Sequence, residues 1–299
     1  MRIGIIHLTQ RIDSWSNYYA WELRRRGHEV VWCAEFIGPF PDYQWRPPDC
    51  DFYLQIDDSR SYETPSIYRP LIYLCSDTHV PDGVDRGVIA GNADFTFVCQ
   101  VNGGEVLVAS MTEPKPMAWM PHAAWFFPER AKEMKFDVCS HMVLGQTDHP
   151  IFGERSQLCH RIVDELCQRV PDRSGNKVYR VRIRSGIFHH EMADNYAVSR
   201  IVWHHSVGND LAMRIFEGAA CGACVVSNRI KDNGMEEIFG DLIPQYDTAD
   251  ECINLIRSLL DKPKECEERG RELRKLVEGQ HRYVDRVDRV LDKAKEWMR

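Results

Sequence analysis

The sequence has no long hydrophobic run: none of its apolar stretches approaches the roughly 20 residues that a helix needs to cross a bilayer. It has no excess of positive charge either, since 38 Lys and Arg stand against 45 Asp and Glu. The formal net charge of −7 argues against a large basic face for nucleic acid. The first ten residues, MRIGIIHLTQ, turn polar too soon for a signal peptide. We therefore expect a cytoplasmic globular protein without a transmembrane segment.

Paired cysteine motifs are also scarce. The 11 cysteines are an odd number scattered along the chain, which suits reduced, buried thiols better than a disulfide framework. Cys221 and Cys224 form a C-x-x-C, but no second pair follows at the spacing of a zinc site. The motif also falls between a predicted helix end and a predicted buried strand. We therefore predict no metal site.

A basic cluster occupies residues 24–26, in the last turn of a helix predicted over residues 17–27. Cations at this place suit the negative end of the helix dipole. The alternative is peripheral contact with a membrane surface, for which larger clusters are usual. The sequence leaves both interpretations open.

With 299 residues the chain is long enough for two domains of about 120–170 residues, each with its own core. Apolar stretches of strand length alternate with amphipathic helical stretches from the start. A strand over residues 2–8 precedes the helix over residues 17–27, and a second strand over residues 28–34 follows. This alternation predicts parallel sheets covered by helices, the α/β fold class.

The most informative segment comprises residues 196–237. Apolar spacing predicts a helix over residues 211–221, preceded by a short strand and a polar turn, and ended by Gly222. A second buried strand follows, so the segment forms a right-handed crossover unit. We expect Asn209 or Asp210 to cap the helix. The N–H groups of its first turn would then form a phosphate site.

Arg214 and Glu217 share one face of this helix because they are three residues apart. Arginine can grip a diphosphate through its fork of donors, and a glutamate one turn further can accept hydrogen bonds from the ribose hydroxyls. The alternative is a ladder of surface ion pairs that includes Asp210. In the nucleotide interpretation, the diphosphate also binds backbone N–H groups of Gly208, Asn209, Asp210 and Leu211.

Three further residues follow predicted strands. The run VYRVRIR over residues 178–184 alternates apolar and basic residues, so its last arginine, Arg184, can reach a diphosphate or pair with a surface acid. Asp77 and His79 follow a strand predicted over residues 71–74, at the edge where parallel sheets bind ligands. They are candidates for acceptor orientation or proton transfer, or else a turn-forming aspartate and a surface histidine.

The run RIFEGAACGACVVSN, followed by GMEEIFGD, resembles the donor-binding segment of glycosyltransferases with the GT-B fold. The resemblance is to the bacterial spore-maturation type, near the retaining group-one transferases, and extends over roughly residues 136–291. Glu217 matches the family glutamate that holds the nucleotide ribose. Tyr196 begins an element that matches a family pattern before the central strand. The family's Glu-x7-Glu pair is incomplete, because its first position falls on Asn209.

The resemblance implies two Rossmann-like domains that face each other across a cleft, with the C-terminal helix crossing back to the first domain. Residues 1–122 would form the acceptor-side domain, residues 123–280 the nucleotide-sugar-binding domain, and residues 281–299 the returning helix. In such families the chain changes domain at a turn similar to MPHAAWFFP, which contains His122. His122 is a third catalytic candidate, or a residue that packs in the hinge.

The implied activity is transfer of a sugar from a nucleotide sugar, more specifically a uridine diphosphate sugar, to an unidentified acceptor. That acceptor is a glycan, lipid, protein, small metabolite or modified DNA base. The nucleotide sugar is a substrate, and no further cofactor is expected. We expect a metal-independent enzyme, because fixed dipoles and arginines can neutralise the charge on the leaving diphosphate. A nucleotide-sugar epimerase or hydrolase, or a binding protein without turnover, is the alternative.

Overall fold

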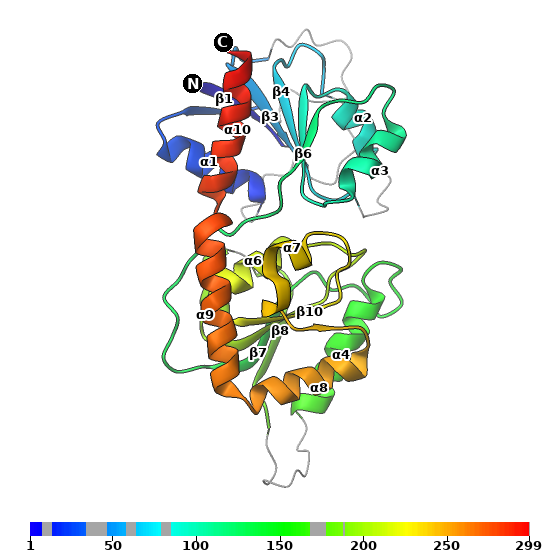
Figure 1. Cartoon of the computed structure of the whole chain (residues 1–299), viewed down its shortest axis with the longest axis vertical. Helices are drawn as coiled ribbons and strands as arrows, with labels where there is room; N and C mark the ends of the chain where they lie inside the picture. Colours follow the sequence, from blue (N-terminus) through cyan, green and yellow to red (C-terminus); the bar gives the residue numbers. More distant parts are fainter. Residues whose placement is uncertain are drawn as a thin grey trace. The chain divides into compact units, whose positions relative to one another are not determined.

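The structure is a computed structural model of the chain (Figure 1), and it describes residues 1–7, 14–33, 47–57, 64–78, 85–167, 178–187 and 189–298. The chain divides into two compact units. The first unit consists of Met1–Pro121 together with Tyr283–Arg299, and the second of His122–Arg282. The chain therefore leaves the first unit once and returns to it with its last helix.

The first unit is built on a six-stranded parallel sheet with the order β2-β1-β3-β4-β5-β6. Its strands are β1 (Arg2–Ile6), β2 (Glu29–Trp32), β3 (Phe52–Ile56), β4 (Leu71–Cys75), β5 (Phe95–Val98) and β6 (Met117–Trp119). The strands β3 and β4 are buried along their whole length, as their continuous apolar runs require. The predicted α/β class is confirmed here.

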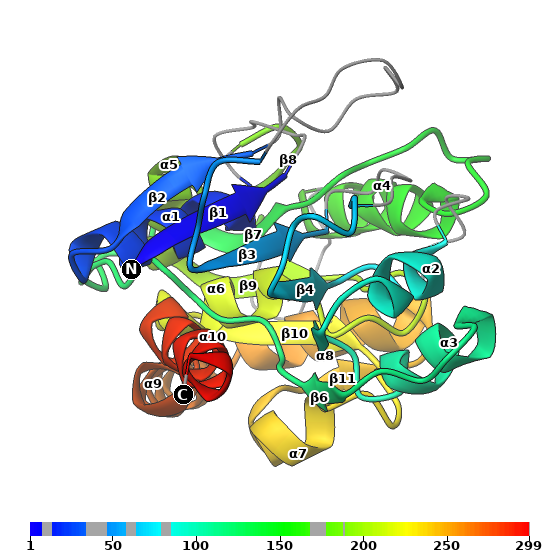
Figure 2. The same cartoon turned by 90° about the horizontal axis from the view of Figure 1, so that it is seen from above.

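Helices cover both faces of this sheet (Figures 1 and 2). They are α1 (Trp15–Arg25), α2 (Arg86–Gly91), α3 (Gly103–Ser110) and α10 (Tyr283–Trp297). The helix α10 places Arg289 over the ring of Phe97, whereas the next residue of β5, Val98, packs in the same cluster as α2 and α3. Neighbouring residues of a strand point to opposite faces, so the two helix pairs lie on opposite sides.

The predicted return of the C-terminal helix to the first domain is confirmed by the contacts of α10. The rings of Tyr18 and Tyr283 lie 4.8 Å apart, and Arg286 Nε donates to the carbonyl of Pro121 at 2.7 Å. The basic cluster at the end of α1 takes part as well: Arg26 pairs with Asp288 of α10. Arg25 and Arg26 also donate to the buried carboxylate of Glu22, each at 2.9 Å. Both arginines are therefore paired with carboxylates of their own unit.

The second unit has a five-stranded parallel sheet with the order β11-β10-β9-β7-β8. Its strands are β7 (Phe136–His141), β8 (Val181–Arg184), β9 (Ser199–His204), β10 (Cys224–Asn228) and β11 (Gln245–Tyr246). Residues 240–242 form a 3-10 turn, and β11 follows it.

Helices cover both faces of this sheet too. They are α4 (Gly153–Cys167), α5 (His189–Ala197), α6 (Met213–Ala220), α7 (Met235–Phe239), α8 (Ala249–Leu260) and α9 (Pro263–Gln280). In β9, Ile201 and Trp203 pack with α4 and α8, whereas Val202 packs with α5, α6 and α9. The order of the strands reverses between β7 and β9, which is where parallel sheets bind ligands at their carboxyl edge.

Candidate functional site

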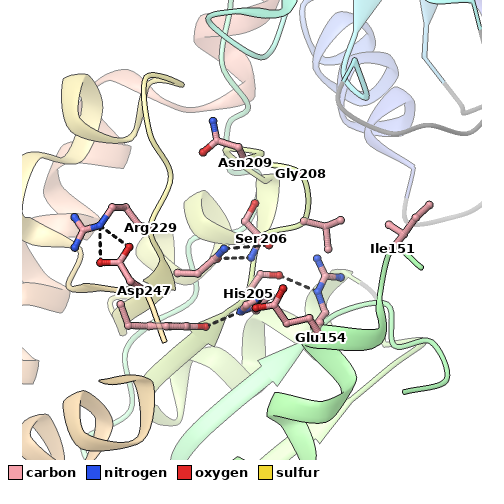
Figure 3. A pocket seen from close by; sticks show the side chains of 12 residues that line it. Ile151, Glu154, His205, Ser206, Gly208, Asn209, Arg229 and Asp247 are labelled. Carbon is pink, nitrogen blue, oxygen red and sulfur yellow. Dashed lines mark hydrogen bonds and ion pairs between the residues drawn. The ribbon is translucent and has the colours of Figure 1, made fainter. Parts of the chain in front are cut away.

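A polar pocket of about 240 Å³ lies at the carboxyl ends of β9, β10 and β11 in the second unit (Figure 3). Its lining comes from residues that end or follow these strands, among them His205, Asn228 and Asp247. The first turn of α4 adds Glu154 and Arg155. Because α4 follows β7, the pocket lies beside the point where the strand order reverses.

The loop between β9 and α6 forms one wall of the pocket. Gly208 and Asn209 both adopt left-handed backbone, with φ of 62° and 63°, a conformation that suits glycine and asparagine. Ser206, the residue at the start of this loop, contacts the backbone of Asp210 through its hydroxyl. This contact ties the start of the loop to its end.

The helix α6 begins at Met213 with Ala212 as its N-cap, and no side chain caps it. The prediction of a helix that starts at residue 211, capped by Asn209 or Asp210, is therefore wrong. The side chain of Asn209 instead binds the backbone of Lys231. The backbone N–H of Asp210 donates to Val207 O at 3.3 Å, inside the turn.

Arg155 joins α4 to the ends of β7 and β9. Its Nε donates to His205 O at 2.8 Å and its Nη1 to Val143 O at 3.0 Å. Only 8% of Arg155 is exposed, and burial lowers the pKa of its guanidinium to about 10. It therefore stays protonated at neutral pH and places a positive charge in the wall of the pocket.

His205 lies at the floor of the pocket in a chain of aromatic hydrogen bonds. Trp203 Nε1 donates to the hydroxyl of Tyr246 at 2.8 Å, and that hydroxyl lies 3.0 Å from His205 Nδ1. Burial, with a smaller effect from Arg155, lowers the pKa of His205 to about 4. His205 is therefore neutral at physiological pH, with its Nε2 4.0 Å from Glu154.

Two exposed charges lie at the rim. Arg229 Nε donates to both carboxylate oxygens of Asp247, at 2.8 and 2.9 Å. Figure 3 shows this pair on one side of the pocket and Glu154 with Ile151 on the other. The rim of the pocket therefore carries side chains of both charges.

Arg214 and Glu217 meet in α6, as their spacing predicted. Arg214 Nη1 donates to Glu217 Oε2 at 2.6 Å and contacts the sulfur of Met192 at 3.0 Å. The Glu217 side chain is only 6% exposed, whereas that of Arg214 is 22% exposed. The two form a mostly buried ion pair rather than a solvated surface ladder, and the same loop that lines the pocket leads directly to it.

Tyr196 lies near this pair at the end of α5, where it is almost completely buried. Its hydroxyl accepts the backbone N–H of His141 at 3.2 Å, and its ring stacks on the His141 ring at 5.2 Å. Burial, followed by the charges of Arg214 and Arg182, lowers the pKa of His141 to about 4. Tyr196 thus fixes the end of β7. Arg184 is exposed at the end of β8, where its carbonyl accepts from the backbone of Met142.

The described catalytic candidates are divided between the two units. Asp77 belongs to the first unit and follows β4; its backbone N–H donates to Asp57 Oδ2 at 3.2 Å. His79 lies outside the described residues. His122 begins the second unit. The first unit gains a group that the sequence analysis missed: the buried pair of Asp57 and Arg86, 2.6 Å apart, holds the turn that contains Asp77.

Within the described residues, no helix is long and apolar enough to cross a membrane. In the same part of the chain, no three His, Cys, Asp or Glu side chains come together as a metal site would require. Cys221 and Cys224 are both buried, as predicted.

The chain thus consists of two parallel α/β units, the second with a polar pocket at its carboxyl edge. A family model described as glycosyl transferase-like matches residues 147–292, which cover most of the second unit and the start of α10. The fold is the GT-B fold of solved glycosyltransferases, and residues 147–292 are similar to glycosyl transferases.

Solved structures share this fold at low sequence identity. An α-glucosyltransferase in complex with UDP-glucose and DNA containing an abasic site matches with a TM-score of 0.66, 12% identity and 99% coverage of both chains. Sucrose-phosphate synthase from Thermosynechococcus elongatus matches with a TM-score of 0.65 and 11% identity, over 99% of both chains. HepE from Anabaena, in complex with UDP-glucose, matches with a TM-score of 0.64 and 12% identity, over 98% of this chain and 100% of the HepE chain. No curated protein sequence is significantly similar to this one.

Proposed function

We propose that the protein transfers a sugar from a uridine diphosphate sugar to an acceptor, with the donor bound at the carboxyl edge of the second unit. One observation carries this proposal. The loop after β9 lines the polar pocket and then leads into the helix that bears the Arg214–Glu217 pair. Two of the similar structures, the α-glucosyltransferase and HepE, contain UDP-glucose, which supports uridine diphosphate as the nucleotide.

In this proposal Glu217 accepts hydrogen bonds from the ribose hydroxyls. Arg214 Nη1 donates to Glu217 Oε2 at 2.6 Å, and this ion pair holds the carboxylate in place. Arg214 also provides positive charge for the diphosphate, together with the backbone N–H groups of Gly208, Asn209 and Leu211. Arg184 borders the nucleotide, and the buried Tyr196 supports the site through the end of β7. The polar pocket next to the loop then holds the sugar that is attached to the diphosphate.

The reaction forms a bond between an acceptor oxygen and the anomeric carbon of the sugar. The bond from that carbon to the diphosphate oxygen breaks, its electron pair leaves with uridine diphosphate, and the acceptor proton passes to a base. Positive charges fixed beside the diphosphate stabilise the charge that develops on it, without the need for a metal ion. Arg155 and Arg214 are suited to this task. Asp77, His79 and His122 remain the candidates for the base.

Binding without turnover is the second candidate function. It is favoured by Asn209, which stands where the resembling family often has a glutamate and whose amide is bound to the backbone of Lys231. The acceptor class stays open among glycan, lipid, protein, small metabolite and modified DNA base.

The decisive experiment measures release of uridine diphosphate from UDP-glucose and other UDP sugars, with and without a panel of acceptors. Release that depends on an acceptor supports transfer. Release of free sugar without an acceptor, or interconversion of the sugars, would identify a hydrolase or an epimerase instead. Calorimetric binding of uridine diphosphate with no release under any condition would identify the binding protein.

A further inference from the structure

Two asparagine side chains join the loop after β9 to the loop after β10. Asn209 Nδ2 donates to Lys231 O, and Lys231 N donates to Asn209 Oδ1, both at 2.7 Å. Asn228 repeats the arrangement with Ser206: its Oδ1 accepts from Ser206 N at 2.6 Å, and its Nδ2 donates to Ser206 O at 3.1 Å. Each side-chain amide thus pairs with a backbone as one peptide unit pairs with another in a sheet.

A third asparagine completes the connection. Asn233, of which only 2% is exposed, donates from Nδ2 to the carbonyl of Asn209 at 2.6 Å. The carbonyl and the side chain of Asn209 are therefore both used by the loop after β10. Because β9 and β10 are neighbouring parallel strands, these bonds extend their pairing beyond the end of the sheet.

The loop needs such support because two consecutive residues, Gly208 and Asn209, adopt left-handed backbone. Glycine loses more conformational freedom on folding than any other residue, so a free loop of this kind would sample many states. The four hydrogen bonds of the Asn209 and Asn228 side chains select one of these loop conformations. A side-chain amide suits this task because it presents a donor and an acceptor side by side, whereas an ionised carboxylate presents two acceptors.

We infer that Asn209 and Asn228 are positioning residues: their paired amides hold the Ser206–Leu211 loop in the shape that binds the diphosphate of the donor. This inference rests on the proposed function. Because the side chain of Asn209 is hydrogen-bonded to the backbone of Lys231, Asn209 does not act as an acid or base. A loop that is already ordered loses less entropy on binding, and this raises affinity for the group that it contacts.

The test uses Asn209→Asp and Asn228→Asp, which keep the size of the side chain but replace the donating nitrogen by an oxygen that faces a carbonyl. Asn102→Asp is the matched control, because Asn102 is exposed and its side chain does not cap α3. Hydrogen–deuterium exchange of the full-length protein reports the loop directly. We expect amides 206–212 to exchange at least about tenfold faster in the two variants than in wild type or the control.

The second measurement separates positioning from a general loss of stability. We expect the dissociation constant of uridine diphosphate, measured by calorimetry, to rise about tenfold in both variants. The affinity for uridine, measured by ligand-observed NMR, should stay as in wild type because Glu217 holds the ribose from α6. A merely structural role would weaken uridine and uridine diphosphate alike.

Each remaining outcome overturns one claim. Faster exchange with unchanged affinity for uridine diphosphate would show that the amides order the loop without positioning the ligand. Unchanged exchange in both variants would refute the pairing itself. If wild type binds no uridine diphosphate, the proposed donor and the positioning role both fail, while the exchange data still decide whether the amides order the loop.

Discussion

At the scale of single residues, Glu217 is the side chain on which the proposed donor site most depends. Its carboxylate is nearly buried and, in the proposed function, accepts hydrogen bonds from the ribose hydroxyls of the nucleotide. We expect Glu217→Gln to weaken binding of uridine diphosphate by about 1–3 kcal/mol, because hydrogen bonds to a charged acceptor are worth more than those to a neutral one. Calorimetry measures this. Glu236→Gln, at an exposed position of α7, is the control, and equal affinity in both variants would refute the ribose role.

Arg155 allows a prediction about stability instead. Its two bonds to carbonyls at the ends of β7 and β9 need the fixed fork of a guanidinium. Arg155→Lys should therefore lower the free energy of unfolding by about 1–3 kcal/mol, as expected when a buried carbonyl loses its donor. Arg161→Lys changes an exposed ion pair on the same helix and should cost less than about 1 kcal/mol. Urea denaturation compares the two; equal losses would contradict the proposed role of Arg155.

These residues show what the sequence reveals about a site. Arg214 and Glu217 are three apart on one helix, so their contact follows from local geometry. The contacts of Arg155 with the ends of two strands depend on where the chain places three distant segments. Asn228 was missed for the same reason, although a polar residue that ends a buried strand was a usable indication of its place at the carboxyl edge.

At the scale of elements, α9 lies unusually close to the end of α6. A Cβ atom at Gly270 of α9 would lie 2.2 Å from the carbonyl oxygen of Gly222. Gly270→Ala should therefore force the two segments apart and lower the free energy of unfolding by about 1–3 kcal/mol. Gly279→Ala is the matched control in the same helix, because its Cβ would meet open space; it should be neutral or stabilising by up to about 1 kcal/mol. Equal effects of the two changes on chemical denaturation would contradict this packing.

Most helices and strands were predictable, but several of their ends were not. Gly222 ends α6 in left-handed backbone, with φ of 72°, as its position after the apolar run indicated. The start of α6 was misplaced because Asn209 pairs with Lys231, 22 residues away, and so does not cap the helix. A polar side chain before a helix has several possible partners, and only the fold decides which one it takes.

At the scale of the whole molecule, the alternation of strands and helices predicted the α/β class, since period and composition are local properties. The order of the strands within each sheet could not be predicted from the sequence. Nothing in the segments themselves says that β9 lies beside β7 on the side opposite β8. This order is nevertheless what brings the loop after β9 next to the first turn of α4, and so creates the pocket.

Buried histidines make the stability of the protein depend on pH. Burial lowers the pKa of both His141 and His205 from 6.5 to about 4. Between these values the unfolded chain binds protons that the folded chain does not, so stability is present above about pH 6.5 and is lost as the pH falls toward 4. Each histidine contributes up to about 3 kcal/mol at full effect. Arginine partners lower the pKa values of the Glu22 and Asp247 carboxyls, at Glu22 against the opposing effect of burial. The stability that these ion pairs give the protein is therefore also lost as the pH falls.

The contribution of one histidine is separable from the rest by comparison with His205→Gln, which keeps a polar side chain but does not titrate. The free energy of unfolding, measured by urea denaturation from pH 7.5 to 4.5, should fall less steeply in the variant than in wild type. The slopes should differ by up to about 1.4 kcal/mol per pH unit near pH 5, the value for one proton. Above pH 7 the two curves should run parallel, because His205 is neutral in the folded chain and largely neutral in the unfolded one. Parallel curves down to pH 4.5 would show that His205 takes up its proton in the folded protein, and therefore that the floor of the pocket is open to water.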